Sequence, residues 1–467
     1  MKTKLDLLRD FYNSKWYALF VTLLAFLSHL TGYDYACFLV MTVTLIAGCF
    51  IAYDFRFAIM PFLCTVCFVT VEHTPNIPNY SDYYVQPLQL TTLIVSFSLI
   101  LIGFVIFIIR NRRRANSLSW KGSFSGLAIL CAALCLNGIF NASYGIENLF
   151  YALSFPLTLL ITFVLYALFV RFEDGAFDHF MYCLVMAGML IVAQLLLAYA
   201  TGIVQYDENG TIIKESVILG WAVWNSFGGL LTILIPACFY FAATHRYGWI
   251  FYGLGLLEFF AAVLSQSRTA TLVGAGIVVL CIGTVCFFGR NRKLNRWITL
   301  GLIVIGALGV FVLWNKIIGI FQNFINYGFD DNGRFERWQA GIDKFIAHPI
   351  FGAGFYDSGI LDTSWEIRVY PYLYHNTIIQ MMGSAGVIGL LAYLWHRFCT
   401  IRMVFRKPNL YKTFLGFCIL ALLAFGMLDV LFFITYPLFY YSLMLLFMEK
   451  SGEKDASSID VVKESIE

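Results

Sequence analysis

Long apolar runs alternate with short polar segments along most of the 467 residues of this chain. A helix needs about 17–25 predominantly apolar residues to cross the hydrocarbon core of a membrane. Such runs lie near 16–32, 35–53, 57–71, 88–109, 122–140, 149–170, 180–200, 226–243, 249–264, 269–289, 297–314, 376–395, 413–430 and 431–448. They are too long and too evenly apolar for barrel strands. The pattern predicts an all-α polytopic membrane protein with about 14 transmembrane helices, or 12–13 if some short runs do not cross.

The composition supports this class. Hydrophobic residues make up 60% of the chain and charged residues 13%, and the mean hydropathy is +0.77. Soluble domains are typically about half apolar and a quarter charged, so a soluble globular protein is excluded. The first apolar run follows four lysines and arginines and has no small-residue cleavage site, so we expect it to remain as the first span.

The positive charges predict an orientation. With the N-terminus in the cytoplasm, 24 of the 31 lysines and arginines fall in segments on the cytoplasmic side. These segments include the clusters Arg110–Arg114, Arg290–Lys293 and Arg402–Lys407. Cytoplasmic loops carry an excess of Lys and Arg, so the distribution predicts cytoplasmic N- and C-termini.

Most of the remaining cations fall in one long extracytoplasmic loop. The seven on that side are Lys214, Arg268, Lys316, Arg334, Arg337, Lys344 and Arg368. Five of them lie in the predicted loop 315–375, and a loop of this length is usually functional. Within it, 334–347 is predicted to form an amphipathic helix on the membrane surface, with an apolar face at helical spacing.

Three regions follow from this organisation. Residues 1–220 are predicted to hold the N-terminal transmembrane helices, and residues 221–448 a catalytic region that includes the loop. The polar segment 449–467 is predicted to be a disordered cytoplasmic tail.

The extracytoplasmic arginines are candidate ligands for an anion. Arg268 follows Ser267 at a junction between two spans, where it is either an interfacial anchor or an anion ligand with a hydroxyl beside it. Arg334 and Arg337 lie one turn apart, and a guanidinium matches phosphate oxygens in a bidentate manner. Arg268 and Arg334 together could clamp a diphosphate without a metal. Arg337 is a further substrate-binding candidate, or it pairs with Asp331, Glu336 or Asp343.

His375, at the start of a span, is the candidate general base. It is either part of an interfacial aromatic belt or a group that takes a proton from a sugar hydroxyl. Asn376 is a candidate ligand for that hydroxyl. Asp429 could orient His375 or balance an arginine, or it is a solvated acid in a short turn. Glu258 is an intramembrane charge to which the sequence assigns no role. No motif for nucleotide or metal hydrolase chemistry is present, so we expect no metal and no cofactor.

These residues resemble those of the O-antigen ligase and polymerase superfamily of bacterial membrane glycosyltransferases. The resemblance covers roughly residues 225–440. It rests on Trp224–Phe227, Ser267–Arg268, Gly333–Arg334, Trp338, Pro349–Gly354, His375–Asn376 and Gly386–Gly389. Family members often have an acid before the Gly-x-x-Gly, where this chain has Ser384. The resemblance implies a GT-C-like fold. It also implies that arginines at the extracytoplasmic face hold the diphosphate of an undecaprenyl-linked glycan, and that His375 activates the acceptor.

The sequence therefore predicts an inverting, metal-independent glycosyltransferase in the cytoplasmic membrane of a bacterium. Its expected partners are an undecaprenyl-diphosphate-linked glycan donor, a glycan or lipid-linked acceptor and membrane lipids, and no nucleic acid. The alternative is a flippase for lipid-linked oligosaccharides or another polysaccharide transporter, and a third option is an inactive partner in an envelope assembly complex. Ligase or polymerase activity, and the oligomeric state, stay open.

Overall fold

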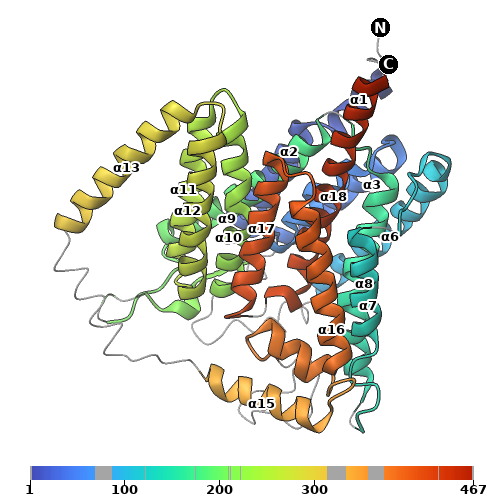
Figure 1. Ribbon diagram of the computed structural model, residues 1–467. Coiled ribbons are helices and arrows are strands. Elements are labelled where there is room, and N and C mark those ends of the chain that lie inside the picture. The colour runs from blue at the N-terminus through green and yellow to red at the C-terminus, as the bar shows by residue number, and fades with distance from the viewer. Residues whose placement is uncertain are drawn as a thin grey trace.

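The protein is described by a computed structural model that covers residues 3–68, 87–120, 122–142, 144–173, 175–208, 210, 212–220, 222–312, 333–355, 373–429 and 431–464. Within these ranges helices dominate the fold (Figure 1). The strands described there are β1 (Ile218–Leu219) and β2 (Ala222–Val223), which form one antiparallel pair. The all-α prediction is confirmed.

The described helices of the first half of the chain run from α1 to α9. They are α1 (Lys4–Tyr12), α2 (Lys15–Thr31), α3 (Asp34–Ile51), η1 (Phe55–Ala58), α4 (Ile59–Cys64), η2 (Thr65–Cys67), α6 (Pro87–Asn111), η3 (Arg112–Arg114), α7 (Ser123–Cys135), α8 (Ile146–Phe169) and α9 (Ala176–Ala200). The run predicted as a span near 57–71 differs: up to Phe68 it is a six-residue α-helix between two 3-10 turns. Phe55 and Phe57 in this segment are buried among aromatic rings, so tertiary packing replaces a continuous helix.

The second half carries the candidate site. Its elements are η4 (Lys214–Ser216), α10 (Trp224–Thr244), α11 (Gly248–Leu264), α12 (Arg268–Phe288), α13 (Arg292–Val312), α15 (Arg334–Ala347), α16 (Thr377–Phe405), α17 (Leu410–Gly426), η5 (Leu431–Phe433) and α18 (Thr435–Glu464). Of the described helices, seven have at least 18 residues and are apolar enough to cross a membrane, and five shorter apolar helices accompany them. The polytopic helical membrane class is therefore confirmed.

Helix α10 lies at the centre of the second half. It packs against α9, α11, α12 and α17, and its residues from Phe227 to Ala243 are all buried. The adjacent Gly228 and Gly229 lie close to two different partners. Gly228 adjoins Ser265 and Ala270, around the start of α12, whereas Gly229 adjoins Phe425 near the end of α17. The N-terminal end of α12 and the C-terminal end of α17 therefore lie at the same end of the bundle.

Helices α15 and α18 mark opposite ends of the bundle. Helix α15 lies across one end, whereas α18 runs to the other end, where α1 also lies (Figure 1). Helix α18 extends from Thr435 to Glu464. One boundary differs from the predictions. Helix α16 continues beyond the predicted end at 395, so Arg397 lies inside the helix and is buried.

Candidate active site

Helix α15 is the amphipathic helix predicted from the sequence, and it docks on α16 through glycine. A Cβ atom at Gly341 would lie 2.5 Å from Ile379 Cγ2 and 3.1 Å from the ring of Tyr374. On α16, Gly383 packs equally closely on the tyrosine ring, since a Cβ atom there would lie 2.8 Å from Tyr374 Cε2. The tyrosine ring is thus held between glycines of two helices. Phe335, on the predicted apolar face of α15, is 65% exposed, as expected for a side chain that faces lipid.

The segment that follows α15 fixes the start of α16. Helix α16 is kinked at Gly386, where φ is 65° and ψ is −161°. Across this kink, Ala353 N–H donates to Gly383 O at 2.8 Å and Val387 N–H donates to Pro349 O at 2.8 Å. The backbone groups released by the kink are therefore bonded to a neighbouring segment, which buried polar backbone requires. The Pro349–Gly354 motif acts as a clamp on α16.

Ser384 and Gln380 complete this support from inside α16. Gln380 accepts the backbone N–H of Tyr374 at 2.8 Å, and it donates through Nε2 to Ser384 Oγ at 2.8 Å. Both side chains are fully buried. Ser384, which stands where family members often have an acid, therefore holds a hydrogen bond in the interior. Gln380 was not identified from the sequence, although an amide side chain in an apolar span indicates a hydrogen bond in the interior.

His375 is presented between Tyr374 and the start of α16. Its φ is +52°, a left-handed conformation that few non-glycine residues adopt. The next residue, Asn376, caps α16: its side-chain oxygen accepts the N–H groups of Ile378 and Ile379 at 2.9 and 3.1 Å. Its amide nitrogen donates to Met427 O at 2.9 Å. Asn376 therefore ties the start of α16 to the turn that carries Asp429, and it is a positioning residue here.

The structure brings His375, Asp429 and Arg337 together from three elements. His375 Nδ1 lies 2.8 Å from Asp429 Oδ1, and the Nη1 atom of Arg337 is hydrogen-bonded to His375 Nε2. Arginine can only donate, so Nε2 accepts and the ring proton is on Nδ1, facing the carboxylate. The histidine side chain is 25% exposed and that of Asp429 10%. The sequence-based hypothesis that Asp429 orients His375 agrees with this contact.

The other predicted arginines, Arg334 and Arg268, lie at the starts of α15 and α12. Arg334 is partly buried at the start of α15, one turn before Arg337, and no hydrogen bond or ion pair engages its side chain within the described ranges. Arg268 is exposed at the start of α12, at the same end of the bundle as Asp429. Ser267 is fully buried and its Oγ accepts Ala270 N–H at 3.3 Å, so it caps α12 and positions Arg268. The predicted pairing of Arg337 with Asp331 lies outside the described residues.

Known proteins are similar to this chain in the region that carries these residues. Residues 251–394 match the model of the O-antigen ligase family. The chain is also 27% identical over 223 residues to the exopolysaccharide production protein ExoQ of Rhizobium meliloti (strain 1021). That similarity covers 44% of this chain and 50% of ExoQ, so the chain spans about half the length of this curated relative. The family resemblance is confirmed. The matched segment holds Arg268, the α15 arginines and His375, and it ends before Asp429.

Proposed function

We propose that the protein is a membrane glycosyltransferase of cell-surface polysaccharide synthesis, and the match of residues 251–394 to the O-antigen ligase family supports this proposal. It moves a glycan from an undecaprenyl-diphosphate-linked donor to an acceptor hydroxyl at the extracytoplasmic face of the cytoplasmic membrane. The family match and the similarity to an exopolysaccharide production protein support the substrate class.

The contact between His375 and Asp429 carries the mechanistic part of this proposal. With its proton on Nδ1, the imidazole has an unshared electron pair on Nε2 that can accept a proton. Asp429 holds the ring in this tautomer and stabilises the imidazolium that forms, as a carboxylate does behind other catalytic histidines. Arg337 occupies Nε2 without substrate and is exposed, so it is free to turn toward an anionic donor. His375 is then available to the acceptor hydroxyl.

The reaction is a single displacement. The acceptor oxygen attacks the anomeric carbon as the bond from that carbon to the diphosphate oxygen breaks, and the hydroxyl proton passes to His375 Nε2. Arg268, Arg334 and Arg337 offer guanidinium groups to the diphosphate as negative charge develops on it. Attack on the face opposite the leaving group inverts the anomeric centre. Binding both substrates in one site makes the attack effectively intramolecular.

The proposal is tested by transfer with purified protein in detergent. Undecaprenyl-diphosphate oligosaccharide is supplied with candidate acceptors in the presence of a metal chelator, and products are separated by size. We expect metal-independent product, as a ladder for a polymerase and as a single addition for a ligase. If no acceptor yields product while liposomes carrying the protein move the donor across the bilayer, the transferase proposal is wrong and the flippase alternative holds.

Replacing each α15 arginine by lysine tests how the donor is held. Lysine keeps the charge and loses the bidentate fork. We expect Arg337→Lys and Arg334→Lys each to lower kcat/KM by about 10-fold or more, since one lost charge-assisted hydrogen bond is worth about 1.5–3 kcal/mol. Steady-state kinetics with varied donor measures this. Lys344→Arg, in the last turn of the same helix, is the control and should retain wild-type kinetics. Full activity in both arginine variants would mean that a point charge is sufficient.

A further inference from the structure

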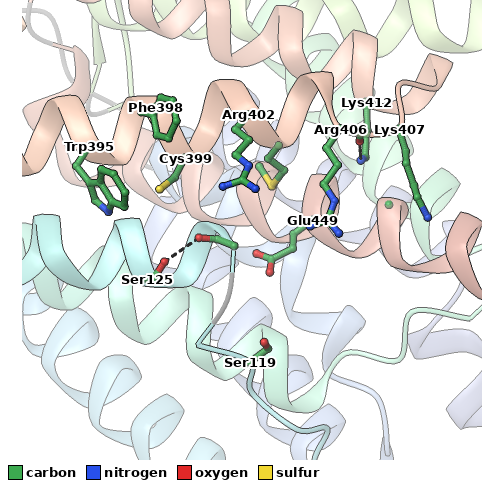
Figure 2. Close-up of a pocket in the computed structure, with 13 residues that line it drawn as sticks. Ser119, Ser125, Trp395, Phe398, Cys399, Arg402, Arg406, Lys407, Lys412 and Glu449 are labelled. Carbon is green, nitrogen blue, oxygen red and sulfur yellow. Dashed lines mark hydrogen bonds between the residues drawn. The ribbon is translucent and has the colours of Figure 1, made fainter.

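A second site lies at the end of the bundle that holds the end of α18. A cavity of about 620 Å³ opens between the last turns of α16, the start of α17, the segment before α7 and α18. Figure 2 shows its lining, with the arginines at the end of α16, Arg402 and Arg406, pointing toward Glu449 of α18. Helix α16 begins next to His375 and ends in this cavity, so the two sites lie at opposite ends of one helix. The charge distribution along the chain predicts that this end is cytoplasmic.

The cavity holds more positive than negative charge. Arg402, Arg406, Lys407 and Lys412 line it together with one acid, Glu449. Two of these charged groups already have structural roles. Lys412 is buried and donates through Nζ to Arg406 O at 2.6 Å, which satisfies the end of α16. Glu449 accepts the N–H of Ser123 at 3.3 Å, at the positive end of α7.

Arg402, Arg406 and Lys407 are the cations without such roles, and two of them are arginines. The two arginines lie four residues apart, Arg402 in the last turn of α16 and Arg406 at its C-cap, and their side chains are exposed. In the described part of the chain, no hydrogen bond or ion pair engages either guanidinium. Two adjacent guanidinium forks are suited to the oxygens of one phosphate group. Ser119 and Ser125 lie on the facing wall, where the Ser125 hydroxyl donates to Gly122 O at 3.0 Å (Figure 2).

The wall next to the arginines is apolar. Trp395 and Phe398 also line the cavity, 48% and 54% exposed, and they precede Arg402 by seven and four residues. This spacing places the aromatic and cationic side chains along one stripe of the helix, with the cations toward its C-terminal end. The stripe is therefore apolar toward the middle of the bundle and cationic at its end. A free phosphate ion would contact only the cationic part of this stripe and would leave the apolar part empty.

We propose that this cavity binds an anionic glycerophospholipid of the surrounding membrane. Its phosphate lies on Arg402 and Arg406, and its acyl chains lie along Trp395 and Phe398. Basic pockets between helices at the cytoplasmic side recognise anionic head groups in this way. The site is independent of the proposed transferase chemistry, because none of its residues belongs to the group around His375.

Lipid titration of the purified protein tests the proposal. The protein in detergent is titrated with phosphatidylglycerol, phosphatidylethanolamine or inorganic phosphate, and bound lipid is counted by native mass spectrometry. The double variant Arg402→Gln/Arg406→Gln should weaken phosphatidylglycerol binding about 10- to 30-fold, since each basic residue near an anionic lipid contributes about 1 kcal/mol. Arg290→Gln/Arg292→Gln removes two exposed cations from another turn outside the cavity and should change binding less than about 2-fold.

Three outcomes would overturn the proposal. An equal loss in both double variants would show that general surface charge attracts the lipid. Equal affinity for phosphatidylethanolamine would show that the negative charge of the head group does not contribute to binding. Displacement of the lipid by inorganic phosphate at equal concentration would indicate a site for the free ion. Since both pairs of arginines are exposed, we expect both variants to fold, with wild-type elution in size-exclusion chromatography as the check.

Discussion

Replacing His375 by alanine should lower glycan transfer by about 10²-fold or more while leaving donor binding close to wild type. The imidazole is the base in the proposed mechanism, and its removal leaves the acceptor hydroxyl without a proton acceptor. The arginines that face the diphosphate remain in place, so the loss should appear in kcat rather than in the donor dissociation constant. Single-turnover transfer and equilibrium donor binding, measured on the same preparation, separate the two quantities.

His348→Ala is the matched control for this experiment. His348 is partly exposed, belongs to the same polar region and is separated from His375 by the clamp and by residues outside the described ranges. Its backbone oxygen accepts Gly352 N–H, a bond that alanine retains. We expect wild-type transfer from this variant. Transfer by His375→Ala at the wild-type rate would disprove the assignment of the base, whereas an equal loss in both histidine variants would indicate damage to the whole region.

The helices were predictable because membrane insertion imposes a simple length rule on the sequence. Each of the predicted apolar runs outside the segment near 57–71 coincides with a helix, and α15 has the predicted bounds. The failures have a local cause. Arg397 looked like the start of a cytoplasmic segment, yet its guanidinium packs over the rings of Tyr393, Phe432 and Tyr441. A cation enclosed by aromatic rings extends the helix past the point where hydropathy alone ends it.

The candidate site was predictable in its residue types and only partly in its contacts. Polar residues at the rim of an apolar bundle are costly, which is why Arg268, Arg334, Arg337 and His375 stood out. The sequence favoured Arg334 over Arg337 as the diphosphate ligand, whereas the structure places Arg337 on His375. Both arginines lie on one turn of α15, and only the docking of that helix decides which faces the histidine. Docking depends on packing at Gly341, which no periodic pattern reveals.

The sequence pattern also could not decide between two roles of a polar side chain, capping a helix and binding substrate. Asn376 and Ser267 were predicted to bind substrate, and both are engaged as helix caps. Asn, Ser and their relatives favour caps for the same hydrogen-bonding capacity that suits them to ligands. The sequence also left Asp429 open between a solvated turn acid and an acid that orients His375, and the structure places its Oδ1 atom 2.8 Å from His375 Nδ1.

A second large effect is expected from Gly352→Ala, which tests whether the clamp on α16 maintains the site. Gly352 has φ +68°, and a Cβ atom there would overlap the backbone of Ser384 and Ala385 at the kink. Backbone atoms cannot rotate away as a side-chain end can, so the clamp must separate from α16. Alanine in this conformation costs about 1–2 kcal/mol, and the overlap adds about 1–3 kcal/mol. We expect a thermal midpoint lowered by about 5 °C and transfer reduced by at least about 10-fold.

Gly202→Ala separates the overlap from the backbone cost. Gly202 has a similar φ of +74°, and nothing lies within 4 Å of the Cβ position that alanine would occupy. Both variants therefore carry the penalty of a left-handed alanine, and only Gly352→Ala adds the collision with α16. The first turns of α16 follow directly on His375 and Asn376, so a shift of these turns changes the distance from His375 to Asp429. Equal losses of stability and transfer in the two variants would show that the clamp does not position the histidine, and a larger loss at Gly352 would show that it does.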